Sequence, residues 1–174
     1  MKIQIIGHSG SGKSTFAKNL QAHYLVPILH IDKIFFNPNW KKRDPSVVES
    51  EIRAFMKQND SWIIDGKYRK IALERYDEAD QIFFLDFNRF TCLYRAIKRR
   101  VKYNRQVRDT VADGCRERIS PDFLWWIIYR GRSRVERRFY KDVIKKYQDK
   151  TVILKNQKQV DAYLKTHNIK NNVK

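Results

Sequence analysis

Short apolar runs alternate along this chain with longer stretches in which apolar residues recur at helical spacing. The apolar runs predict strands over residues 2–6, 24–31, 62–64, 81–85 and 151–154. Runs that are apolar at every position are typical of parallel strands, because such strands are buried on both faces. Strands that alternate with helices are joined by right-handed crossovers. The pattern therefore predicts an α/β fold in which helices flank a five-stranded parallel sheet.

Helical spacing of apolar residues fills most intervals between these runs. The predicted helices cover residues 13–24, 46–59, 91–101, 121–129, 133–148 and 159–166. Ser46 is expected to cap the second of them, because Glu49 follows at the spacing of a capping box. Ser120 and Ser133 are expected to cap two later helices. Residues 102–119 show no sustained period, so we expect a loop or a short helical excursion there.

The length of 174 residues predicts a single domain that spans residues 1–174. Cys92 and Cys115 stand 23 positions apart without a CxxC pair, so we expect neither a disulfide framework nor a zinc site. The apolar stretch at the N-terminus is too short for a signal peptide, and the chain has no run long enough to span a membrane. These features predict a protein of the reducing cytoplasm.

Positive charge is concentrated in the second half of the chain. The formal net charge is +18, and residues 89–174 hold 24 Lys or Arg against 8 Asp or Glu. Such a field attracts polyanions, which include nucleotides, phosphorylated substrates, nucleic acid and anionic membranes. The charge by itself does not choose among them. Trp125 and Trp126 lie in this half, in a helical stretch where we expect them to belong to the core.

The strongest motif is Gly7–Ser14, GHSGSGKS, which matches G-x-x-x-x-G-K-[ST] between a predicted strand and a predicted helix. Its glycines let the backbone wrap a polyphosphate with successive N–H groups. Lys13 is expected to bridge the β- and γ-phosphates of ATP, and the Ser14 hydroxyl to bind Mg²⁺. The predicted ATP-binding residues are Gly7, Ser9, Gly10, Ser11, Gly12, Lys13, Ser14 and Thr15.

Three carboxylates follow predicted strands and are candidates for the same site. Asp65 and Asp86 each end an apolar strand, and either one is a candidate to hold the metal ion or a residue of a strand-terminal turn. We prefer Asp65, because Gly66 after it allows close approach of a ligand. Asp32 is a candidate to orient or deprotonate a substrate hydroxyl, with a turn cap as the alternative.

Two further residues near Asp32 have less specific signals. His30 lies within an apolar strand, so we interpret it as a buried histidine with its hydrogen bonds satisfied. Trp40 follows a loop of Asn and Pro, and its ring is as good a candidate for a substrate platform as for the core.

The motif segments together resemble a known group of proteins. The segments are ILHIDKIFFNPNW at 28–40, SWIIDGKY at 61–68, DQIFFLDFNR at 80–89, LYRAIKRR at 93–100 and GCRERI at 114–119. The chain resembles small adenylate-kinase-like P-loop kinases, and more closely the bacterial proteins known as DNA topology modulation or FlaR-related proteins. The resemblance implies an adenylate-kinase-like fold, ATP binding, and a kinase whose acceptor the family name does not settle.

The same resemblance implies roles for individual residues. Residues 89–119 would form an Arg-rich lid, with Arg95, Arg99 and Arg100 on or near the transferring phosphates. A solvated helix face is the alternative for each of these arginines. Asp65 would lie near Mg²⁺, and the acceptor side would comprise Asp32, Trp40, Asp65, Gly66 and Arg69.

Two departures from that pattern bear on the acceptor. Lys67 stands where the family more often has Asn after Asp-Gly, and residues 37–55 contain no counterpart of the segment that clasps AMP in adenylate kinases. AMP is therefore disfavoured as the acceptor.

The sequence as a whole favours a phosphotransferase. We expect transfer of the γ-phosphoryl group of Mg-ATP to a small hydroxylated or phosphorylated acceptor such as a nucleotide, with Lys13, Asp32, Arg95 and Arg99 as catalytic residues. One alternative is a regulatory protein that binds nucleic acid through the basic second half, including RGRSRVERR at 130–138, and uses ATP as a switch. A simple ATPase or a protein of the membrane surface is a third possibility.

Overall fold

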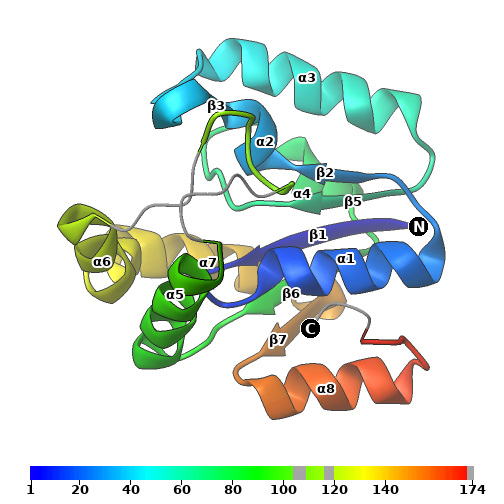
Figure 1. The fold of residues 1–174 in the computed structure, drawn as a ribbon. Coiled ribbons are helices and arrows are strands. Elements are labelled where there is room, and N and C mark those ends of the chain that lie inside the picture. The colour runs from blue at the N-terminus through cyan, green and yellow to red at the C-terminus, as the bar shows by residue number, and fades with distance from the viewer. Residues whose placement is uncertain (104–108, 116–119, 172–174) are drawn as a thin grey trace.

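A computed structural model describes residues 1–103, 109–115 and 120–171 of the chain. Within these residues, five strands form one sheet in the order β2-β5-β1-β6-β7 (Figure 1). Every neighbouring pair in this sheet is parallel, which confirms the predicted architecture. The strands are β1 Lys2–Gly7, β2 Ile28–His30, β5 Trp62–Asp65, β6 Gln81–Leu85 and β7 Thr151–Leu154.

Helices cover both faces of this sheet. The longer ones are α1 Lys13–Tyr24, α3 Pro45–Gln58, α5 Arg89–Tyr103, α6 Pro121–Ile128, α7 Arg134–Lys146 and α8 Gln157–Thr166. Short elements that the sequence analysis did not predict are α2 Ile31–Phe35, α4 Glu74–Glu78, the hairpin of β3 Phe36–Asn37 and β4 Lys41–Lys42, and the 3-10 turns η1 Pro38–Trp40, η2 Arg130–Arg132 and η3 Gln148–Lys150.

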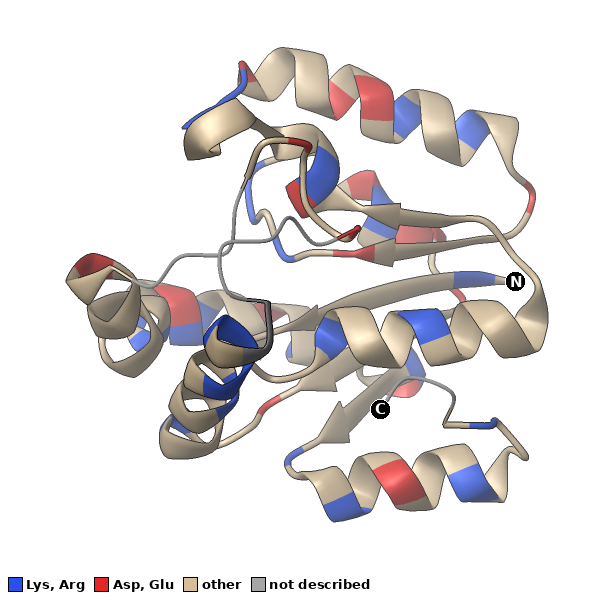
Figure 2. Cartoon of the chain, in the orientation of Figure 1, with Lys and Arg blue, Asp and Glu red and all other residues tan. Residues whose placement is uncertain are grey.

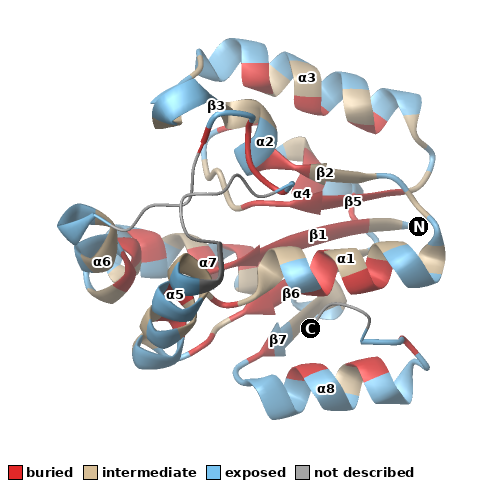
Figure 3. Ribbon diagram, in the orientation of Figure 1, coloured by how far each residue is buried: buried red, intermediate tan, exposed pale blue. Residues whose placement is uncertain are grey.

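Alternation of side chains along each strand divides the core into two layers. In β6, Phe83 and Leu85 pack with α1 and α8, whereas Ile82 and Phe84 face the side covered by α3, α4 and α7. This is the two-residue period of a strand, here buried on both faces. Figure 3 shows the buried strands as a band between the helices. The carboxyl ends of the strands therefore meet at one edge, where Asp65 lies beside Ile5 of β1 and His30 of β2.

The N-terminus of α3 corrects the predicted capping. The N-cap is Asp44, whose carboxylate accepts a hydrogen bond of 2.8 Å from the backbone N–H of Ser46. Pro45 occupies the first helical turn, where its missing N–H costs no hydrogen bond. The helix therefore begins before Ser46, and the prediction of Ser46 as the cap is wrong. The predicted caps Ser120 and Ser133 are confirmed, because each hydroxyl accepts a backbone N–H three residues later.

The placement of the tryptophans in α6 also differs from expectation. Trp125 and Trp126 are 52% and 38% exposed, so the prediction that they belong to the core is wrong. Ile127 of the same helix is buried, and α6 packs against α5 and η2. A helix that is apolar around most of its circumference leaves part of that surface in water when its neighbours cover only one side. Trp125 packs instead against Tyr129 with tilted rings, at 4.1 Å between ring centroids.

Two simpler expectations are also tested by the structure. Cys92 and Cys115 are both free and buried, as predicted for a chain without a disulfide framework. Among the helices described, none combines the length and the apolar content that crossing a membrane requires.

The predicted lid, residues 89–119, is described in two parts. The first part is α5, which packs on the core through Cys92 and Ala96. The second part, residues 109–115, lies against the β3–β4 hairpin, where the backbone N–H of Asn39 donates to the carbonyl of Gly114. Residues 104–108 and 116–119 lie outside the described residues, so the Arg-rich lid stays a prediction.

One buried arginine organises the loop that follows β5. Arg75 of α4 is fully buried, and its guanidinium donates to the backbone carbonyls of Lys67, Tyr68, Ile71 and Ala72. Burial lowers the pKa of this guanidinium, because the charged group has lost its contact with water. Tyr68 and Ala72 both have positive φ angles, of 31° and 45°. The hydrogen bonds of Arg75 thus stabilise a backbone conformation that Tyr68 and Ala72 disfavour by themselves.

We expect Arg75→Met to destabilise the protein by about 3 kcal/mol or more, because it leaves several buried carbonyls without a donor. Urea unfolding followed by circular dichroism measures the loss. Arg53→Met is the matched control and should change the stability little, because Arg53 is 59% exposed and its ion pair with Glu49 lies at the surface. Equal stability of the two variants would contradict this role of Arg75.

Candidate functional site

The glycine-rich loop Gly7–Ser14 connects β1 to α1 at the carboxyl edge of the sheet. Gly10 and Gly12 have φ angles of +81° and +96°, which side chains rarely permit. A Cβ atom at Gly10 would lie 2.4 Å from the carbonyl oxygen of Cys92 in α5, so a larger residue does not fit. The loop is therefore held in one conformation both by its own backbone and by the start of α5.

The N-terminus of α1 and the Lys13 ammonium together offer hydrogen-bond donors and a positive charge that suit an anion. The first N–H groups of an α-helix have no acceptor within the helix, so those at the start of α1 are available to a bound phosphate. Lys13 Nζ donates to the carbonyl oxygen of His8 at 2.9 Å, which folds the side chain over the loop. Burial lowers the pKa of Lys13, although the charges of Asp65 and Asp32 oppose this effect.

The other predicted loop residues lie around this anion site. Ser9 is partly exposed, Ser11 is buried, and Thr15 is exposed in the first turn of α1. The Ser11 hydroxyl has no hydrogen-bond partner among the described residues.

Asp65 joins three elements of the site. Its Oδ2 atom accepts from the Ser14 hydroxyl at 2.7 Å and lies 2.9 Å from His30 Nδ1. Burial alone raises the pKa of Asp65, but the hydrogen bond with His30, the charge of Lys13 and the hydrogen bond from Ser14 outweigh it. The pKa of Asp65 therefore lies below its usual value, and the carboxylate is ionised at neutral pH. His30 is buried and hydrogen-bonded, as interpreted from the sequence.

This part of the site fits Mg²⁺ in its donor chemistry. Asp65 Oδ1 is buried and has no hydrogen-bond partner among the described residues, so one carboxylate oxygen is left for a further ligand. Mg²⁺ takes oxygen ligands and is commonly held by one or two protein groups together with phosphates and waters. Within the described residues, no cluster of three or more His, Cys, Asp or Glu could hold a metal alone. Ser14 and Asp65 therefore suit an ion that arrives with a nucleotide.

Gly66 sets the path of the chain after Asp65. Its φ angle is +146°, and a Cβ atom there would lie 2.9 Å from the Ile31 side chain. The buried side chain of Gln4 donates to the carbonyl oxygens of Ile64 and Gly66, at 3.2 and 3.0 Å. The Ile31 side chain and the hydrogen bonds of Gln4 thus fix the turn that directs Asp65 toward the loop.

Asp32 faces the same space from α2 and is exposed. Its Oδ1 atom accepts a hydrogen bond of 2.5 Å from the hydroxyl of Tyr68. The carboxylate lies close enough to Lys13 for its charge to raise the lysine pKa. Burial and the Asp32 charge raise the pKa of Tyr68 well above its usual value, so the phenol stays protonated and donates. Asp32 is an ionisable group that an incoming molecule can reach beside Lys13.

Trp40 belongs to a small apolar cluster beside Asp32. Its ring packs on Phe36 at 5.3 Å between centroids, and both rings contact the cluster of Val111, Ala112 and Cys115. The Cys115 thiol donates to the Asn37 carbonyl at 3.3 Å, and Lys18 of α1 pairs with Asp109. Trp40 thus helps to attach residues 109–115 to the hairpin and remains partly exposed.

The sequence analysis missed an ion-pair cluster on the other side of the loop. Glu136 of α7 is buried and pairs with Lys67, and its other oxygen lies 3.7 Å from Arg69 Nε. Lys67 is also near Lys13, because its charge lowers the pKa of that residue. Glu136 stands three residues after Ser133, which is capping-box spacing, yet its carboxylate faces Lys67. Only the tertiary contact between α7 and the loop after β5 identifies this pair.

The arginines of α5 differ in their surroundings. Arg95 donates to the carbonyl oxygen of Ser11 at 3.0 Å and to the side chain of Gln157 at 2.7 Å, so it links the loop to α8. Arg99 lies one helical turn further along the same side, and Arg99 and Arg100 are both partly buried. The structure thus brings Arg95 to the loop rim.

Asp86, the second candidate for metal binding, pairs with His8. Its Oδ1 atom is 3.2 Å from His8 Nε2, and the hydrogen bond with His8 is the main cause that lowers the pKa of this carboxyl. His8 also packs edge-on against the ring of Tyr140 in α7, at 5.1 Å between centroids. Asp86 therefore serves to position His8 in the glycine-rich loop, a role that the strand-end pattern did not predict.

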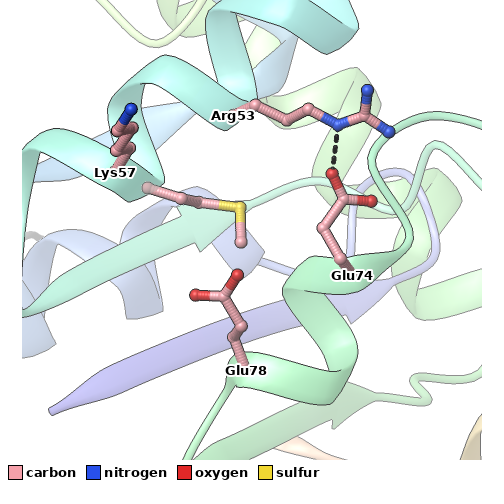
Figure 4. A pocket seen from close by; sticks show the side chains of 5 residues that line it. Arg53, Lys57, Glu74 and Glu78 are labelled. Carbon is pink, nitrogen blue, oxygen red and sulfur yellow. Dashed lines mark hydrogen bonds and ion pairs between the residues drawn. The ribbon is translucent and has the colours of Figure 1, made fainter.

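A separate pocket of about 340 Å³ lies between α3 and α4 (Figure 4). Its lining residues are Arg53, Met56, Lys57, Glu74 and Glu78. Arg53 pairs with Glu74, and Lys2 pairs with Glu78 at 2.9 Å. Because the charges here are of both signs and largely paired, this pocket is not a candidate for polyphosphate binding.

Comparison with solved structures shows proteins that share the fold of this chain. The chain superposes on a deoxyadenosine kinase from M. mycoides with bound dATP at a TM-score of 0.58 and 14% sequence identity, over 97% of this chain and 100% of that one. A structure of deoxyadenosine kinase from M. mycoides with dCMP and a flexible dCDP gives 0.52 and 15%, over 97% and 98%.

Sequence comparisons add no family to this result. No protein-family model matches the chain, and no curated protein matches it. The resemblance to the DNA topology modulation or FlaR-related proteins therefore receives no support from them.

The burial of His8 leads to a prediction of how the stability of the protein depends on pH. Burial lowers the pKa of His8 below its ordinary value of 6.5. Below about pH 6.5 the unfolded chain therefore binds a proton that the folded protein does not, and stability falls as the pH falls. We expect the free energy of unfolding to decrease from pH 7 to pH 5, and the decrease to be smaller in His8→Phe, which keeps a ring in place.

Urea unfolding at a series of pH values measures this effect. His23→Phe, which replaces an exposed histidine of α1, is the matched control and should keep the dependence of the parent protein. The Asp86 contribution is lost only near or below its ordinary pKa of 3.8, outside this window. An unchanged pH dependence in His8→Phe would show that His8 is not its source.

Proposed function

We propose that this protein is an ATP- and Mg²⁺-dependent phosphotransferase whose acceptor is a small hydroxylated molecule such as a nucleoside or nucleotide. The observation that carries the proposal is the arrangement of Lys13, the Ser14–Asp65 pair and the exposed Asp32 around one space. The solved structures with the same fold are described as deoxyadenosine kinases, which favours a nucleoside among the possible acceptors.

On this proposal the loop binds the polyphosphate of the donor. The N–H groups at the start of α1 would contact its oxygens, and Lys13 would stay close to the β- and γ-phosphates as charge develops in the transition state. Mg²⁺, held through Ser14 and Asp65, supplies charge neutralisation on the phosphates when it is bound. Phosphoryl transfer requires little beyond such positioning and electrostatic stabilisation.

Asp32 would act on the acceptor. Its carboxylate would accept a hydrogen bond from the attacking hydroxyl, orient it, and take its proton as the new P–O bond forms and the bond from the γ-phosphorus to the bridging oxygen of the leaving ADP breaks. Tyr68 donates to the same carboxylate and so fixes its direction. Trp40, Gly66 and Arg69 are proposed to line the acceptor side, next to Asp32 and Asp65.

The arginines are proposed to complete the phosphate site. Arg95 at the loop rim, with Arg99 and Arg100 on the same helix, would counter the charge of the transferring group. Residues 89–119 would then act as a lid that excludes water and favours transfer over hydrolysis. The chain would function as a single domain over residues 1–174.

Lys13→Ala is expected to reduce phosphoryl transfer by about 10²- to 10³-fold, because it removes the main cation from the transferring phosphate. Transfer of label from γ-labelled ATP is measured with a panel of nucleosides, nucleotides, sugars and DNA, and ADP formation is recorded separately. Lys165→Ala, which changes an exposed lysine of α8, is the control. Parent-level transfer by Lys13→Ala would contradict the proposal. ADP release stimulated only by DNA, with no acceptor labelled, would favour the nucleic-acid-dependent alternative.

Asp32→Asn is expected to lower transfer by about 10²- to 10⁴-fold and to leave ATP affinity near that of the parent, because the change removes the proton acceptor on the acceptor side. Rates are measured with the acceptor that the panel identifies, and ATP affinity by calorimetry. Asp60→Asn, at an exposed carboxylate before β5, should behave as the parent. A matching loss of ATP affinity in Asp32→Asn would instead place Asp32 in the donor site.

A further inference from the structure

An apolar stripe runs along the outward side of α5. Phe90, Tyr94, Ile97 and Val101 recur at intervals of four, three and four residues, so they lie on one side of the helix. They are 68%, 64%, 46% and 75% exposed. Single exposed apolar residues are common on proteins, but a continuous row of large ones usually marks an interaction surface.

Folding does not account for this stripe. The side of α5 that packs on the core is formed by Cys92 and Ala96, which are fully buried. At about 100° per residue, Tyr94 and Val101 lie on the opposite side of the helix from Cys92. The stripe therefore points away from the protein interior.

The neighbouring helix also exposes aromatic rings. α6 packs against α5, and Trp125 and Tyr129 of α6 and its C-cap are 52% and 51% exposed. Figure 1 shows the two helices side by side at one end of the molecule, away from α3. We name this surface the α5–α6 face, which comprises Phe90, Tyr94, Ile97, Val101, Trp125 and Tyr129.

Positive charge flanks the stripe. Within α5 the sequence has no Asp or Glu, and its six basic residues are Arg89, Arg95, Lys98, Arg99, Arg100 and Lys102. Figure 2 shows basic residues, and no acidic ones, along the ribbon of this helix. Of these residues, Lys98 is exposed beside the stripe, whereas Arg95 contacts the glycine-rich loop on the other side of the helix. A helix that combines an apolar side with basic residues and no acidic ones is typical of proteins that lie on anionic membranes.

The charge and the residue types of the α5–α6 face distinguish among the partners that could bind there. A second copy of the chain would place one basic α5 against another, and like charges oppose such contact. Single-stranded nucleic acid uses aromatic rings as stacking platforms, whereas Ile97 and Val101 offer none. Trp and Tyr favour the boundary between lipid headgroups and acyl chains, where their rings are apolar and their polar atoms meet water.

We propose that the α5–α6 face docks on an anionic membrane surface. The stripe from Phe90 to Val101 is about 16 Å long at 1.5 Å per residue, and it would lie parallel to the membrane with its side chains among the headgroups. Lys98, which is exposed beside the stripe, would contact lipid phosphates. Because Arg95 on the same helix contacts Ser11, the glycine-rich loop would face the water close to the membrane.

Vesicle cosedimentation of the whole chain, without nucleotide, tests this proposal. Vesicles of phosphatidylcholine with about one third phosphatidylserine should bind the protein about tenfold or more strongly than vesicles of phosphatidylcholine alone. Ile97→Glu/Val101→Glu should lower binding about tenfold or more, because it introduces negative charge into the stripe. Val47→Glu, at a 45% exposed valine of α3, is the matched control and should bind as the parent.

A second variant and two further measurements distinguish the outcomes. Phe90→Ser/Tyr94→Ser tests the stripe without added charge, and circular dichroism checks that each variant is folded. Equal binding to the two kinds of vesicle, or equal binding by parent and stripe variants, would overturn the proposal. A dimer in light scattering that Ile97→Glu/Val101→Glu dissociates would assign the face to a second copy instead. Binding of single-stranded DNA that the stripe variants abolish, without vesicle binding, would assign it to nucleic acid.

Discussion

The hydrogen bonds of one buried carboxylate, Asp65, hold the site of this protein together. Asp65 ends β5, which lies between β2 and β1, and its Oδ2 atom joins His30 at the end of β2 to Ser14 at the start of α1. A buried carboxylate is stable only when such partners compensate for the loss of water. The ends of two strands and one helix are thereby fixed relative to one another. The hydrogen bond from Ser14 to Asp65 thus attaches the end of the glycine-rich loop to β5.

Charges of both signs surround the hydrogen bonds of Asp65. Lys13, Lys67 and Arg69 gather near the loop, where their like charges repel one another. The carboxylate of Glu136 in α7 forms ion pairs with Lys67 and Arg69 and compensates for their charge. Such compensation allows the fold to keep several cations close together. It also connects α7, far along the chain, to the electrostatics of the site.

The basic residues in the second half of the chain lie in different structural environments. Arg95 turns toward the loop and contacts Ser11, and Lys98 is exposed beside the apolar stripe of α5. The two sides of α5 therefore differ in what they face: one lies against the loop and the core, and the other lies in solvent. Net charge is a property of the whole chain, but its effect depends on the helix side that carries each residue.

The sequence by itself determined the sheet, the glycine-rich loop and most helices, because apolar periodicity and the Gly7–Ser14 motif are local signals. It also indicated that Asp65 and Asp32 follow strands that end at one edge. The tertiary structure alone decided that Asp86 pairs with His8, that Glu136 faces Lys67, and that Trp125 and Trp126 are exposed. These outcomes depend on which elements become neighbours after folding. Local patterns do not encode contacts between residues tens of positions apart, because the same spacing is compatible with several partners.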